Sequence, residues 1–104
     1  MIIQYNTDKT INGDQRHEEF FKAQIAEGLS RFERHLSRVE VHLKDENGAK
    51  EAQNDIHCLM EARIEGRQPI AVSSQADTTK LAVSSAISKL QVSLKKVIDH
   101  QKHH

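Results

Sequence analysis

Seven histidines and a single cysteine are the residues of this 104-residue chain whose types could do chemistry. His17-Glu18-Glu19 has the first half of the helical zinc-protease motif, in which two histidines four residues apart bind zinc and a glutamate acts as base. Phe stands at position 21, where the second histidine would be needed, so the motif is absent. The four glycines are scattered singly and form no phosphate-binding loop. We therefore expect this chain not to be an enzyme and to need no cofactor.

Cys58 has the sequence context of a core thiol and not of a nucleophile. It alternates with Ile56 and Met60, so the period of a strand places all three on the same side. No local signature of a catalytic cysteine surrounds it, and buried thiols behave as small apolar side chains. A single cysteine also excludes an internal disulfide and a multi-cysteine zinc site. Stability must therefore come from ordinary packing.

The other histidines that could bind a ligand lie at the C-terminus and in two predicted strands. A C-terminal histidine tract could hold a transition metal weakly, but a flexible His-rich tail over about residues 99–104 is the simpler interpretation, so we assign no metal site. His42 and His57 take outward strand positions and are most simply exposed, although imidazoles can stack on RNA or hydrogen-bond to it. The C-terminal cluster and its neighbouring lysine are His100, Lys102, His103 and His104.

The basic residues of two predicted helices are the strongest sign of a partner. Residues seven apart share one stripe of a helix, and residues three apart are neighbours on it. If the two helices lie side by side on a sheet, their outer surfaces can form one cationic strip that contacts a phosphate backbone. A solvated face without a ligand is the alternative. The residues concerned are Arg31, Arg34, Lys89 and Lys96, with Arg38, Lys95 and Lys102 extending the set.

Charge is distributed unevenly along the chain. Fifteen basic and fifteen acidic residues cancel, which would argue against a nucleic-acid binder if the charge were uniform. Residues 78–104 carry five basic residues and one acidic residue, whereas residues 39–77 carry four basic and eight acidic residues. The aromatic fraction is 4%, too low for a platform on which bases stack. Any RNA recognition should therefore be by shape and phosphate contact.

The composition fits one small globular domain. Hydrophobic residues make up 37% of the chain and charged residues 29%, which predicts a folded protein with a thin core. No stretch approaches the roughly 18 apolar residues that a membrane helix needs, and the first residues do not form a signal peptide. We therefore expect a cytoplasmic protein.

Hydrophobic periodicity predicts an α+β fold in the order β-α-β-β-β-α. Apolar residues at steps of three and four predict helices from about residue 16 to 36 and from about 79 to 97. Consecutive short strands imply an antiparallel meander, and the two helices can bury their apolar stripes only against one face of a four-stranded sheet. Alternation at a period of two predicts strands at residues 2–6, 38–44, 56–64 and 70–74.

The element order and three stretches of sequence resemble the ribosome hibernation-promoting factor family, also called ribosomal subunit interface or sigma-factor modulation proteins. The resemblance is to the short form and extends along nearly the whole chain. It differs from better-known members at Lys80, where they carry an aromatic residue, and about at Val92, where they carry a basic one. The stretches are RVEVHLKDENG at 38–48, MEARIEGRQPIAV at 60–72 and ISKL at 87–90.

This resemblance implies a single ribosome-associated domain over residues 1–104, with a fold like that of the double-stranded-RNA-binding domain. It implies a protein that occupies the small-subunit channel for messenger and transfer RNA and keeps idle ribosomes inactive. The partners would be the small ribosomal subunit and its ribosomal RNA, with no membrane and no small-molecule substrate. By position, Arg31 and Arg34 match basic sites on the family's first helix, and Lys89 and Lys96 match basic sites on its last.

A protein-interaction module is the alternative from a different class. The strand-rich middle of the chain is acidic at Glu40, Glu61 and Glu65, and exposed sheet edges can recruit a partner strand. Such a module would be isolated with a protein partner after nuclease treatment. A ribosome-binding protein would instead be isolated with ribosomal RNA and small-subunit proteins.

Overall fold

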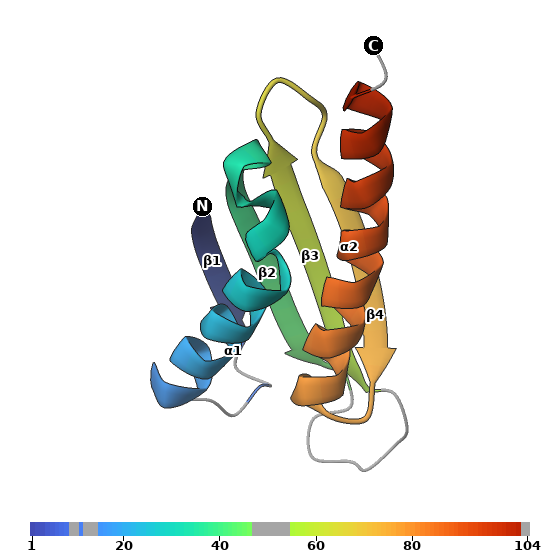
Figure 1. Ribbon diagram of the computed structural model, residues 1–104. Coiled ribbons are helices and arrows are strands. Elements are labelled where there is room, and N and C mark those ends of the chain that lie inside the picture. Colours follow the sequence, from blue (N-terminus) through green and yellow to red (C-terminus); the bar gives the residue numbers. More distant parts are fainter. Residues whose placement is uncertain (9–10, 12–14, 47–54, 103–104) are drawn as a thin grey trace.

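Two helices pack on a four-stranded sheet (Figure 1). The computed structural model describes residues 1–8, 11, 15–46 and 55–102. The predicted α+β class and β-α-β-β-β-α order are confirmed, with a short 3-10 helix added after the first helix. In chain order the elements are β1 (Ile2–Thr7), α1 (Gln15–Gly28), the 3-10 helix η1 (Ser30–His35), β2 (Leu36–Asp45), β3 (Ile56–Ile64), β4 (Ile70–Ala76) and α2 (Thr79–Lys102).

The strands follow one another across the sheet in the order β1-β2-β3-β4. β2, β3 and β4 form the predicted antiparallel meander. β1 pairs with β2 in parallel, with Ile3 opposite Val39 and Tyr5 opposite Val41. A parallel pair needs a long crossover connection, and the segment that contains α1 and η1 supplies it. The alternation of residues in β1 could not predict this direction, because a strand shows the same alternation in a parallel pair as in an antiparallel pair.

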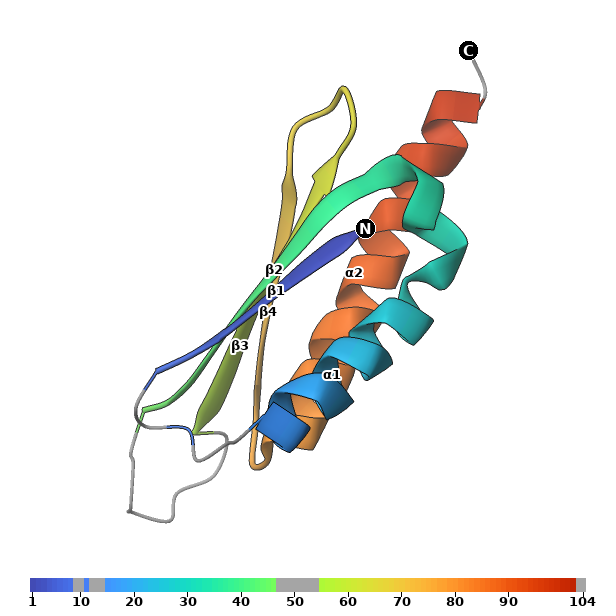
Figure 2. The ribbon, with the colours of Figure 1, turned by 90° about the vertical axis from the view of Figure 1, so that its left-hand side faces the viewer.

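The sheet has one covered face and one uncovered face (Figure 2). Alternate residues of β2, namely Val39, Val41 and Leu43, are buried against the helices. The residues between them, among them Glu40 and His42, are polar and point to the other side. We call the outward-facing residues of the four strands the open face. Both described helices pack on the apolar side, so neither of them covers the open face (Figure 2).

α1 is shorter than the predicted helix from 16 to 36 because the chain changes from α to 3-10 winding at Gly28. In a continuing α-helix the Gly28 carbonyl would accept the Phe32 amide. Here Gln91 Nε2 of α2 donates to that carbonyl at 2.7 Å, and the Phe32 N–H donates to the Leu29 carbonyl at 2.9 Å. η1 thereby keeps Leu29 and Phe32 buried, and Leu36 begins β2. Apolar steps of three and four fit both kinds of helix, so the sequence did not distinguish them.

α2 is longer than predicted. Its buried stripe continues from Leu94 to Ile98, which is 4% exposed, whereas Val97 is half-buried. The helical backbone then runs on to Lys102, beyond residue 99, where we expected a flexible tail to begin. His103 and His104 lie outside the described residues.

An aromatic cluster joins α1 to the edge strand β1. The ring of Tyr5 is stacked parallel to Phe21 at a centroid distance of 6.2 Å, and His17 meets Phe21 edge to face at 4.8 Å. Burial, with smaller contributions from Cys58 and Glu18, raises the pKa of the Tyr5 phenol well above its ordinary value. The phenol oxygen and His17 Nε2 form a hydrogen bond at 2.8 Å. His17 is therefore part of the packing between α1 and β1.

Gly28 is a point of close approach between α1 and α2. A Cβ placed on Gly28 would lie 2.7 Å from Ile87 Cγ2. The β-branched Ile87 side chain has little rotamer freedom in a helix and cannot easily move away. Gly28 is therefore required for space, and any side chain there must push the two helices apart.

We expect Gly28→Ala to lower the free energy of unfolding by about 1–3 kcal/mol, because it overpacks the contact with Ile87. Urea denaturation of the variant measures this loss. Glu27→Ala, at an exposed neighbouring position, serves as the matched control and should change stability by less than about 0.5 kcal/mol. In an Ile87→Ala background the loss from Gly28→Ala should shrink, and an equal loss in both backgrounds would contradict the proposed contact.

Cys58 is buried in the core at 1% exposure, as predicted from its alternation with Ile56 and Met60. Burial raises the pKa of its thiol to about 12, against a smaller lowering effect of the hydrogen bond with Ser74. The thiol therefore stays protonated at neutral pH and is a poor nucleophile.

Alkylation of Cys58 by iodoacetamide should be slow in the folded chain at about pH 8, because the raised pKa leaves roughly a thousandfold less thiolate than an ordinary thiol has. Mass spectrometry of the modified chain over time measures the rate. The same chain unfolded in urea is the control and should react at the rate of a free cysteine. Equal rates in both conditions would show that the thiol is accessible in the native state.

Candidate nucleic-acid interface

Arg31 and Arg34 lie together on η1. Both side chains are exposed, and residues three apart in a 3-10 helix project from the same side. The Arg31 guanidinium lies 5.2 Å from the centroid of the Phe32 ring, a cation–π distance. The change from α to 3-10 winding thus brings the two predicted cations closer to one line than an α-helix would.

Lys89 and Lys96 lie on the flank of α2 that faces β4. Both are exposed, and they are seven residues apart on one stripe of the helix. Lys89 Nζ donates to the Ser73 carbonyl of β4 at 2.7 Å. The amine therefore contacts the edge strand of the sheet as well as solvent.

The two predicted pairs do not lie side by side, because α2 separates them. Gln91, on the other flank of α2, bonds to Gly28. Arg31 lines the shallow groove between α1 and α2 together with Ser88 and Gln91. Arg31 and Arg34 therefore belong to the flank of α2 that faces α1, whereas Lys89 and Lys96 belong to the flank that faces β4. Whether any of the four binds RNA stays a prediction.

The groove between the helices identifies residues that charge counting missed. Ser84, Ser88 and Gln91 line it from α2 at steps of four and three. Lys95 follows Gln91 by four residues, so it continues the same stripe and is exposed. This spacing is visible in the sequence. It can be assigned to the groove only when α1 is known to lie along that flank of α2. Lys95 is the lysine that extends the Arg31 side of the surface.

Two carboxylates of the acidic middle of the chain share one arginine on the open face. Glu40 and Glu61 are directly opposite each other on β2 and β3. Arg63 Nε lies 3.2 Å from Glu40 Oε2 and 3.3 Å from Glu61 Oε1, so one guanidinium bridges both carboxylates. Glu65 is exposed in the turn after β3. Because one guanidinium offsets only one of the two carboxylate charges, Glu40, Glu61 and Arg63 together keep one negative charge. Exposed Glu65 adds another to the surface on which the protein-interaction alternative rests.

The described part of the chain shows neither a metal-binding cluster nor a spanning helix. Nowhere among these residues do three His, Cys, Asp or Glu side chains gather so that they could hold an ion. Of the helices described, none combines the length and the apolar character required to cross a bilayer. The predicted C-terminal histidine cluster falls partly on residues 103–104, outside the described residues.

Two solved structures are similar to this chain in fold, and one of them is described as a ribosomal subunit interface protein. A ribosomal subunit interface protein from Coxiella burnetii is similar to this chain with a TM-score of 0.72 and 15% sequence identity, over 95% of this chain and 99% of that one. The N-terminal domain of Thermus thermophilus Protein Y gives a TM-score of 0.67 and 13% identity, over 93% and 99%. At these identities the likeness shows a shared fold alone.

A sequence comparison with protein families gives the assignment. No curated protein sequence was found to match this chain. Residues 10–102 match the family described as Sigma 54 modulation protein / S30EA ribosomal protein. The match includes all three stretches on which the sequence resemblance rested, and it covers α1, the entire meander and α2. The chain therefore belongs to the Sigma 54 modulation protein / S30EA ribosomal protein family.

Proposed function

We propose that this chain is a cytoplasmic, non-enzymatic ribosome-binding protein that inhibits translation by occupying the small-subunit channel for messenger and transfer RNA. The observation that carries the proposal is the family match over residues 10–102. The description of one similar structure, a ribosomal subunit interface protein, supports the same partner. Inhibition of this kind needs a rigid body of suitable shape and no chemistry, which agrees with a core cysteine that cannot act as a nucleophile.

The contact surface in this proposal is the outer side of η1 and α2. Lysine and arginine side chains on a protein surface bind RNA phosphates and release counterions, so the affinity falls as salt rises. Arg31, Arg34, Lys89 and Lys96 are all exposed and can make such contacts. Because the two pairs lie on opposite flanks of α2, the RNA must reach both sides of this helix. A channel that surrounds the protein with ribosomal RNA would provide that geometry.

The direct test is sucrose-gradient sedimentation of a lysate from stationary cells that express the chain, at low and moderate salt. We expect the chain to sediment with the small subunit or whole ribosomes and to be released as salt rises. A chain that stays at the top of every gradient would contradict ribosome binding.

Charge reversal should locate the phosphate-binding residues. We expect Arg31→Glu/Arg34→Glu and Lys89→Glu/Lys96→Glu each to lower the affinity for purified small subunits by about tenfold or more at low salt. The slope of the logarithm of affinity against the logarithm of salt concentration should become shallower by about one for each phosphate that the variant no longer binds. Binding is measured by filtration with labelled chain across a range of salt concentrations.

The matched control is Arg16→Glu/Arg67→Glu, which changes the net charge equally at two exposed positions outside the predicted cationic set. It should bind nearly as well as the unaltered chain. Because Lys89 also contacts Ser73, circular dichroism must show that the Lys89 variant is folded. Equal losses in the control and in both test variants would show that net charge alone matters, without a defined surface.

A further inference from the structure

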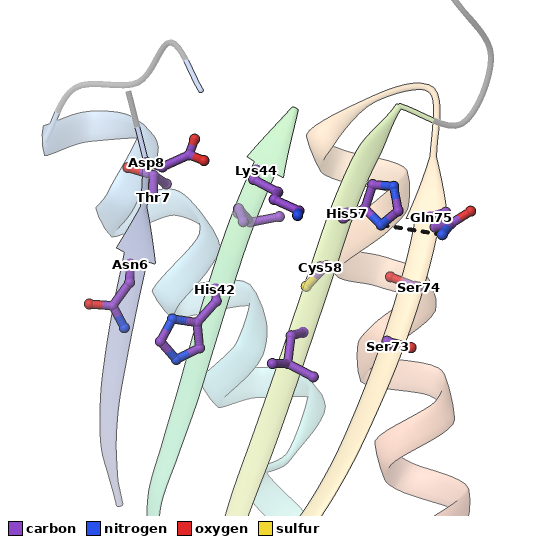
Figure 3. A pocket seen from close by; sticks show the side chains of 12 residues that line it. Asn6, Thr7, Asp8, His42, Lys44, His57, Cys58, Ser73, Ser74 and Gln75 are labelled. Carbon is purple, nitrogen blue, oxygen red and sulfur yellow. Dashed lines mark hydrogen bonds between the residues drawn. The ribbon is translucent and has the colours of Figure 1, made fainter. Parts of the chain in front are cut away.

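The open face of the sheet contains a hollow, which lies on the side opposite the helices and their basic residues. It lies where β2 ends and β3 begins, and residues from all four strands line it (Figure 3). Its volume is about 420 Å³, within the range of sites that hold small planar ligands. We call it the open-face hollow. The side chains that matter are those of Asn6, His42, Lys44, His57, Leu59 and Gln75.

Leu59 is the apolar centre of the open-face hollow. Its side chain is 46% exposed, although the other outward positions of β3 carry His57, Glu61 and Arg63. Leu59 lies directly opposite His42 of β2, and His57 precedes it by two residues on the same face. Two imidazoles on the two central strands therefore flank one exposed apolar side chain.

The ring of His57 is held in place from both of its nitrogens. Nε2 lies 3.2 Å from Glu46 Oε2. Nδ1 lies 3.2 Å from Gln75 Nε2 (Figure 3). A carboxamide nitrogen only donates, so Nδ1 accepts and Nε2 carries the proton toward Glu46. Because both ring nitrogens of His57 already contact other residues of this chain, a ligand can contact this ring through its flat face.

His42 differs from His57 in having no such restraint. Within the described residues its exposed imidazole makes neither a hydrogen bond nor an ion pair. Its nitrogens can therefore bond to the edge of a ligand while its ring stacks. Nearby, the amide nitrogen of Asn6 donates to the Val41 carbonyl at 3.3 Å, which restrains this side chain at the rim.

The charges around the open-face hollow do not favour a phosphate. Lys44 Nζ is the basic group, and it lies 3.2 Å from Glu46 Oε1. Asp8 adds a second carboxylate at the β1 side. Such a site offers stacking surface and hydrogen-bond acceptors, whereas phosphate groups need an excess of positive charge. The side-chain carbonyls of Asn6 and Gln75 and a ring nitrogen of His42 can accept hydrogen bonds from a planar ring that carries amino groups, as adenine, cytosine and guanine do.

We propose that the open-face hollow binds an unpaired base of single-stranded RNA, stacked on Leu59 and the rings of His42 and His57. Four-stranded sheets with helices on one face can use rings on their open face to stack RNA bases, which is the same physical arrangement. The partner class rests on the proposed function, because it gives a ribosome-bound chain a second RNA contact on the side opposite the helices. The low aromatic content concealed this surface, because histidines supply the rings.

Titration of the full isotope-labelled chain with single-stranded hexaadenylate and with adenosine, followed by NMR, tests the proposal. We expect saturable shifts at the amides of His42, His57 and Leu59 with both probes. Since the base and not the phosphate is bound, the affinity for hexaadenylate should change less than about twofold between low and moderate salt. Leu59→Ser and His42→Ala should each weaken hexaadenylate binding by at least about fivefold.

Ile2→Ser is the matched control, because Ile2 is also an exposed apolar residue of the open face but lies outside the hollow. It should leave the affinity unchanged, and the spectra of all variants show whether each is folded. Equal effects of Leu59→Ser and Ile2→Ser would overturn the proposal. So would shifts confined to α1 and α2, or the same shifts on addition of inorganic polyphosphate.

The outcomes separate this inference from the proposed function. A chain that sediments with ribosomes but shows no hexaadenylate shifts in the hollow would overturn the base site and leave ribosome binding intact. A chain that binds hexaadenylate in the hollow but never sediments with ribosomes would support the base site and contradict the proposed function.

Discussion

The single apolar face of the sheet is the constraint on which the rest of the structure depends. Inward residues such as Val41 and Met60 are fully buried, and the polar residues between them cannot be covered without desolvation of their charges. Both helices must therefore share one side of a narrow sheet. This crowding requires Gly28 at the contact between the helices, and it leaves the entire opposite side of the sheet exposed to solvent or to a partner.

Shared use of one face also determines how the cations are distributed. α1 and η1 lie along one flank of α2, and β4 lies along the other. The exposed basic residues are therefore divided between these two flanks. Lys89 contacts the Ser73 carbonyl of the edge strand, so one amine both covers part of a sheet edge and contributes to the surface charge. A neutral protein can in this way present basic regions on both sides of one helix, while Glu40 and Glu61 on the sheet are paired with Arg63.

Local periodicity was sufficient to predict the architecture, and it failed where two structures share a period. The alternations in β2 and β3 placed Val39, Val41 and Cys58 correctly in the core. The break at Gly28 was missed, because its cause is a hydrogen bond from Gln91, which is far away in sequence. The basic residues of η1 and α2 could likewise be identified from the sequence. Their separation into two pairs on opposite flanks of α2 could not, because it depends on how α1 and β4 pack against this helix. The ring pair on the open face needs the cross-strand register of β2 and β3, which no local pattern contains.

The parallel pairing of β1 with β2 has a consequence for the order in which the chain is completed. Ile2 pairs with Arg38 and Thr7 with Leu43, so β1 can pair only with residues that are synthesised much later. α1 can form meanwhile from local contacts, whereas β1 has an uncharged sequence and no partner. A nascent chain that has not yet produced β2 therefore exposes Ile2, Ile3 and Tyr5 together. β1 precedes the other three strands in the sequence, yet it can take its place at the edge of the sheet only after β2 has been made.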